Sequence, residues 1–97
     1  MKILAIAKAP PGITREDFQP DQIAAEAAKV WQIYTSNLLR EIYLRADQLG
    51  AVLMFECANV EEVKAVVDCL PMVKAGLLDF DIIPLNPFLS LETLFAK

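Results

Sequence analysis

Apolar residues recur along this chain with two different periodicities, and the order in which the periodicities alternate leaves few folds open. Runs with a two-residue alternation predict strands, and runs with apolar residues every three or four positions predict helices. The predicted strands are 2–9, 39–45, 51–57 and 77–83, and the predicted helices are 20–36 and 60–70. This βαββαβ order predicts an α+β domain with a four-stranded antiparallel sheet in strand order 4-1-3-2 and both helices on one face.

Proline, glycine and capping residues mark the element ends. Pro10-Pro11-Gly12 ends the first strand, and Pro20 suits the first position of a helix. Asn59 and Glu62 have the spacing of a capping box and predict the start of the second helix. Pro71 is expected to terminate that helix.

A chain of 97 residues suits one domain. We expect this domain to span residues 1–86, with residues 87–97 as its C-terminal docking tail. The segment Phe88–Phe95 is apolar but too short for a stable isolated helix, so it is expected to pack on its own chain or on a neighbour. Because 56% of residues are apolar in so small a unit, some apolar surface needs a partner.

Charge and residue content exclude several function classes. Nine Lys and Arg against 13 Asp and Glu give a net charge of −4 without a basic tract, so no nucleic-acid partner is expected. No apolar run is long enough for a membrane span or a signal peptide, which predicts a cytoplasmic protein without a membrane partner. The chain has no His, and Cys57 and Cys69 are expected as separate, buried, reduced thiols; no metal or other cofactor is expected.

Strand alternation separates two faces of the predicted sheet. The face beneath the helices is wholly apolar: Ile3, Ala5, Ala7, Ile42, Leu44, Leu53, Phe55, Leu78, Phe80 and Ile82. The opposite face, here called the outer face, mixes charged and apolar residues: Lys2, Leu4, Ile6, Lys8, Glu41, Tyr43, Arg45, Val52, Met54, Glu56, Leu77, Asp79, Asp81 and Ile83. Its apolar patch is typical of an interface. We therefore expect a homodimer through the outer face, with a higher oligomer left open.

The first helix carries an apolar stripe that is expected to be buried in the core. It consists of Ile23, Ala27, Val30, Trp31, Tyr34 and Leu38. Core packing is the preferred interpretation of its aromatic residues.

The predicted hairpin places two carboxylates together on the outer face. With no bulge, its register sets Tyr43 opposite Met54 and Glu41 opposite Glu56. Two adjacent carboxylates raise the pKa of one of them, which suits a proton shuttle. In the alternative interpretation, Lys2, Lys8 and Arg45 neutralise the acidic residues as interface ion pairs.

Several runs resemble the muconolactone isomerase-like family of the dimeric α/β-barrel superfamily. They are Arg40–Arg45, Gly50–Glu56, Val60–Val63 and, most specifically, Leu70–Leu85 with its Leu-Pro helix stop and closing Pro84-Leu85. The resemblance implies a ferredoxin-like monomer whose sheets pack face to face as a dimer. It also implies cofactor-free proton transfer on a small unsaturated lactone or organic acid.

For such a reaction the chemistry and facing of the residues suggest roles. Glu41 or Glu56 would shuttle the proton and Tyr43 would donate a hydrogen bond, while Arg45, Arg40 or Lys8 would hold the substrate carboxylate. A second interpretation is a non-catalytic homodimer that binds a small organic acid or serves as a structural module. The enzyme hypothesis predicts a cavity of at least about 300 Å³ that holds an unpaired carboxyl group.

Overall fold

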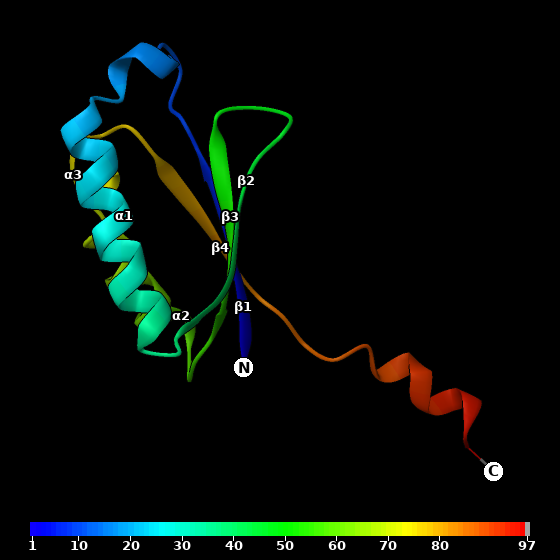
Figure 1. Ribbon diagram of the computed structural model, residues 1–97. Helices are drawn as coiled ribbons and strands as arrows, with labels where there is room; N and C mark the ends of the chain where they lie inside the picture. The colour runs from blue at the N-terminus through cyan, green and yellow to red at the C-terminus, as the bar shows by residue number, and fades with distance from the viewer. Residues whose placement is uncertain (97) are drawn as a thin grey trace.

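A four-stranded antiparallel sheet with its helices on one face forms the body of the protein (Figure 1). The computed structural model describes residues 1–96. The strands are β1 (Lys2–Lys8), β2 (Leu39–Leu44), β3 (Gly50–Glu56) and β4 (Asp79–Pro84), in the order β2-β3-β1-β4. The helices are α1 (Pro20–Thr35), α2 (Val60–Asp68) and α3 (Pro71–Lys74), with 3₁₀ turns η1 (Arg15–Asp17) and η2 (Leu89–Leu94). The predicted α+β class and strand order are confirmed.

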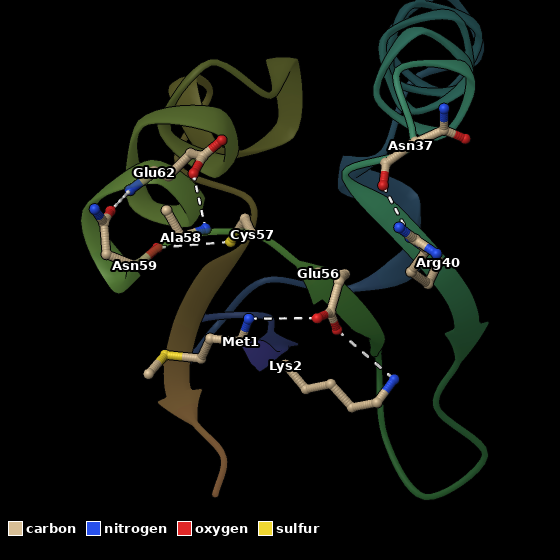
Figure 2. Close-up of polar contacts among 9 residues, drawn as sticks. All are labelled: Met1, Lys2, Asn37, Arg40, Glu56, Cys57, Ala58, Asn59 and Glu62. Atoms are coloured by element: carbon tan, nitrogen blue, oxygen red, sulfur yellow. Dashed lines mark hydrogen bonds and ion pairs between the residues drawn. The ribbon is translucent and has the colours of Figure 1, made fainter.

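Local sequence signals account for the start of α2 and for α3. The Asn59 side-chain oxygen accepts a hydrogen bond from the Glu62 N–H at 2.9 Å, and Glu62 Oε2 accepts one from the Ala58 N–H at 3.1 Å (Figure 2). The predicted helix start is thus confirmed. Pro71 follows the end of α2 as predicted, but it also opens α3, a turn that the sequence analysis did not include, because proline fits the first helical position.

The core lies between β1, β3 and α2. Ile3, Ala5, Leu53 and Phe55 from the sheet are at most 2% exposed, and they pack with Val63, Val67 and Leu70. Two residues assigned to the covered face are not in this core: Ile42 is 38% exposed and Leu44 is 87% exposed. The reason is that both border an open pocket beside α1 rather than a filled layer.

The apolar stripe expected in the core is only partly buried. Val30 and Leu38 pack against the core, whereas the other four members, Ile23, Ala27, Trp31 and Tyr34, are exposed. Trp31 is 65% exposed, Tyr34 46% and Ile23 49%, and the two aromatic rings stack on each other with centroids 6.0 Å apart. The packed side of α1 carries buried Ile33 together with half-buried Glu26 and Val30. Glu26 accepts a hydrogen bond from the Met72 N–H of α3.

The hairpin register differs by two residues from the prediction, because the hairpin closes at Gly50. The Arg45 N–H donates to the Gly50 carbonyl at 3.0 Å, so that Tyr43 lies opposite Val52 and Glu41 lies opposite Met54. A β-bulge between Leu39 and Glu41 shifts only the pairing beyond it, where Leu39 lies opposite Phe55. Glu41 and Glu56 are therefore not direct neighbours, and the predicted carboxylate pair is wrong.

The outer face retains the mixed character that the sequence predicted. Leu4, Ile6, Val52 and Met54 are only partly covered by the chain itself. Leu77 is a correction, because it precedes β4 and is buried at 7% exposure.

The two cysteines are free, but neither is fully buried as expected: Cys57 is half-buried and Cys69 is exposed, since Cys69 caps the end of α2 at the surface. No helix among residues 1–96 is both long and apolar enough to cross a membrane.

The C-terminal segment leaves the body instead of packing on it (Figure 1). The Leu85 N–H still donates to the Lys2 carbonyl at 3.0 Å, and the chain then runs outward through η2. We call residues 86–95 the C-terminal arm. Its apolar side chains are strongly exposed: Phe88 72%, Leu89 64%, Leu91 55%, Leu94 73% and Phe95 81%. Packing on its own chain, one of the two expected arrangements, is not seen in the described residues.

Candidate functional site

A pocket of about 400 Å³ opens between α1 and the hairpin end of the sheet. Fourteen of its sixteen lining residues are apolar or glycine, and the two charged ones are Arg15 and Glu26. Its walls come from η1, α1, both hairpin strands, α3 and β4: Arg15, Phe18, Ile23, Glu26, Ala27, Val30, Ile42, Leu44, Leu49, Gly50, Ala51, Leu53, Leu70, Met72, Leu78 and Phe80. Few polar groups in a largely apolar hollow of this size are typical of small-molecule sites.

Glu26 is fixed in the wall of the pocket by a backbone hydrogen bond. Its Oε1 accepts from the Met72 N–H, in the first turn of α3, at 3.1 Å. No residue of the described chain donates to Oε2 or forms an ion pair with Glu26, and Oε2 is not sealed from solvent. One carboxylate oxygen is therefore anchored while the other can contact a ligand.

Burial raises the pKa of Glu26 above its ordinary value of 4.5, because desolvation outweighs the hydrogen bond from Met72, which acts in the opposite direction. A carboxyl group with a raised pKa holds its proton nearer to neutral pH. Such a group can both take up and return a proton during a reaction.

Arg15 supplies the only positive charge among the pocket-lining residues. It belongs to η1, and its guanidinium forms no ion pair within residues 1–96. A free guanidinium at the wall of an apolar pocket can bind a carboxylate or an enolate oxygen.

A second hollow of about 320 Å³ continues the pocket along α1. It is lined by Ala27, Val30, Trp31, Tyr34 and Ile42, three of which also line the first pocket. We call the two together the α1–β2 groove. Residues of the α1 stripe thus line two adjoining apolar hollows beside β2.

The structure brings two of the predicted catalytic residues together on the outer face, away from the pocket. The Tyr43 hydroxyl donates to Glu41 Oε1 at 3.0 Å, and this hydrogen bond, with the charge of Glu41, raises the pKa of Tyr43. Glu56 lies apart from them, between the N-terminal amine at 3.3 Å and the Lys2 ammonium at 3.8 Å (Figure 2).

The three predicted substrate-binding cations do not converge on one point. Arg45 holds Asp47 with two hydrogen bonds of 3.0 and 2.8 Å, and this contact lowers the pKa of Asp47 to about 2. Arg40 donates to the Asn37 carbonyl at 2.9 Å (Figure 2). Lys8 is exposed at the end of β1. None of the six predicted site residues lines the pocket.

Glu26 and Arg15 were not predicted as site residues, because the charged residues that alternate along the strands all point to the outer face. One signal was present in the sequence: Glu26 lies four positions from Gln22 and Val30 and seven from Ile33, and so shares a helix side with them. A carboxylate on a packed helix side is unusual and points to a specific role.

No family model matches the chain, and no curated protein matches it in sequence. Among solved structures, the chain is similar to 5-chloro-2-hydroxyhydroquinone dehydrochlorinase (TftG) from Burkholderia phenoliruptrix, whose structure is a complex with 2,5-dihydroxybenzoquinone. The TM-score is 0.70 at 24% identity, over 89% of this chain and 94% of that one. This likeness shows that the two chains share the ferredoxin-like α+β fold.

Proposed function

We propose that the protein transfers a proton within a small unsaturated cyclic compound bound in the pocket, without a cofactor. The substrate class is a lactone or a hydroxylated quinone-like ring that carries one negative charge. The observation that carries the proposal is Glu26: a half-buried carboxyl with a raised pKa and one free oxygen in an apolar pocket. The shared fold with a dehydrochlorinase that binds a dihydroxybenzoquinone supports the same substrate class.

The chemistry needs only one proton carrier and one cation. The ionised Glu26 takes a proton from a ring carbon next to the unsaturated carbonyl system, and the electron pair of the broken C–H bond moves onto the carbonyl oxygen. Arg15 stabilises the resulting enolate. Glu26 then returns the proton to a different ring carbon, which shifts the double bond and restores the carboxylate.

The test compares two carboxylates on opposite sides of the sheet. Glu26→Gln and Glu41→Gln are assayed with 2,5-dihydroxybenzoquinone and a set of unsaturated lactones, by thermal shift and by NMR detection of deuterium uptake from D₂O. Glu26→Gln should lower the exchange rate by about 10²-fold or more, while Glu41→Gln should leave it unchanged.

The reverse result would move the chemistry to the outer face, where Glu41, Tyr43 and Glu56 remain the predicted catalytic residues. Saturable binding without exchange in the unaltered protein would instead favour a non-catalytic binding module, the second candidate. The largely apolar pocket supports this second candidate, because such a pocket can bind a small organic acid without catalysing a reaction.

We further propose that two copies associate through their outer faces. The partly uncovered Leu4, Ile6, Val52 and Met54 and the 41% exposed Ile83 support this pairing. Leu4→Arg would bury an unpaired cation in the contact and should abolish association in sedimentation measurements; an unchanged mass would contradict the pairing. We also propose a cytoplasmic location, where two free cysteines remain reduced.

A further inference from the structure

Within residues 1–96, the C-terminal arm and the α1–β2 groove are apolar surfaces that no other part of the chain covers, and they lie at opposite corners of the sheet. The arm leaves β4 at the end where Pro84 pairs with Ile3. The α1–β2 groove borders the other edge strand and extends to the end where Gly50 pairs with Lys8. We propose that the C-terminal arm of one copy docks in the α1–β2 groove of a second copy, so that the pocket is completed by its partner.

The arm cannot take a direct route to the groove of its own chain. On the helix face, the space over β1 and β4 is occupied by α2. The arm also leaves the sheet on the side away from the helices, as Figure 1 shows with the helices on the left and the arm on the right. The arm therefore extends toward the side on which a second copy would pack.

The symmetry of a face-to-face pair brings the two surfaces together. A twofold axis that lies between the sheets along their diagonal exchanges the corner where the arm leaves with the corner at the groove. Facing sheets are about 10 Å apart. The arm spans about 25 Å if four residues are extended and η2 keeps its 3₁₀ rise. This length is enough to pass the partner's β2 edge and enter the groove on its helix face.

The apolar surface that this docking would bury is close to what a stable interface needs. The five exposed apolar side chains of the arm would remove on the order of 500 Å² from water, and the groove would lose a smaller area. Exchange of both arms then approaches the roughly 800 Å² per partner of a stable interface. The groove offers aromatic surface to the arm, because Trp31 and Tyr34 stack at its wall.

This inference rests on the self-association proposed above and not on the chemistry. Trp31 is the only tryptophan of the chain and lines the groove, so its fluorescence reports the arm directly. Acrylamide quenching of Trp31 should fall as protein concentration rises through the association range. In Phe88→Ser/Phe95→Ser it should stay high at every concentration, and self-association should weaken by tenfold or more. Glu92→Gln, at a polar arm position, serves as the matched control and should behave as the unaltered protein.

Cross-linking identifies which chain provides the arm. In a background with both native cysteines replaced by Ala, Leu94→Cys and Leu44→Cys are placed on separate chains and mixed under oxidising conditions. A disulfide-linked pair containing one chain of each kind is expected. Two results would overturn the proposal. In the first, a chain that carries both Leu94→Cys and Leu44→Cys forms only an internal disulfide. In the second, quenching of Trp31 depends neither on protein concentration nor on the arm substitutions. Deuterium exchange on the substrate is not among these readouts, so a failure of the proposed reaction is seen separately from a failure of the docking.

Discussion

Gly50→Ala should be among the most destabilising small substitutions in this protein. A Cβ at position 50 would overlap the Ala7 carbonyl oxygen and lie 3.0 Å from the Ala7 carbonyl carbon, both backbone atoms of the neighbouring strand. Relief requires β3 to move away from β1, which weakens about one ladder hydrogen bond at about 1 kcal/mol and adds about 2 kcal/mol of packing strain. The free energy of unfolding should fall by about 3 kcal/mol, which lowers Tm by about 12–24 °C in a domain of this size.

Gly76→Ala is the matched control. Gly76 has a φ of +76°, but a Cβ there meets no atom within 4 Å. Only the left-handed backbone opposes alanine, at about 1 kcal/mol, or about 4–8 °C in Tm. Urea unfolding followed by circular dichroism measures both variants. If Gly50→Ala were no less stable than Gly76→Ala, the close approach of β3 to β1 at the pocket floor would be refuted.

Three further predictions concern charge and capping. Burial raises the pKa of Glu26 above its unfolded value, so the stability that Glu26 contributes is complete below about pH 4.5 and is lost as pH rises through the folded pKa. The difference in Tm between Glu26→Gln and the unaltered protein should therefore be more positive at pH 7 than at pH 4. A difference in Tm that is the same at both pH values would contradict this. Asn59→Ala should cost about 1 kcal/mol in urea unfolding, with Asn59→Ser close to the unaltered protein, because the cap on Glu62 N–H is lost only in the first. The Asp47 carboxyl should titrate near pH 2 by NMR and return toward 3.8 in Arg45→Gln; titration that does not move would exclude the Arg45 contact as its cause.

The strand order and element bounds followed from the sequence because they depend on local signals. Alternation, proline and the Asn59 cap each act within a few residues, and each predicted element is present. The hairpin register depends on where the turn closes, at Arg45 and Gly50, and the bulge at Arg40 shifts the pairing again beyond Glu41; no local pattern marks either point. The side on which α1 packs depends on a contact with Met72, 46 positions along the chain from Glu26.

The candidate site escaped prediction for the same reason. The sequence shows which residues alternate, but not how far α1 stands from β2. The pocket lies where apolar residues of α1 and β2 face each other across a space that no side chain fills. The enzyme hypothesis predicted a cavity of at least about 300 Å³ with an unpaired carboxyl; the pocket exceeds that size, and the carboxyl group that lines it belongs to Glu26, while Glu41 lies on the outer face.

The bulge in β2 has a consequence for how copies of this chain assemble. β2 and β4 are the two edges of the sheet, and each is unsuited to receiving another strand. The irregular pairing at Arg40 interrupts β2, while β4 carries Asp79 and Asp81 and closes with Pro84. Kinked, acidic and proline-ended borders discourage lateral growth of a sheet into fibrils. The strands of neighbouring copies thus cannot easily join side by side, and association is directed to broad surfaces that close on themselves.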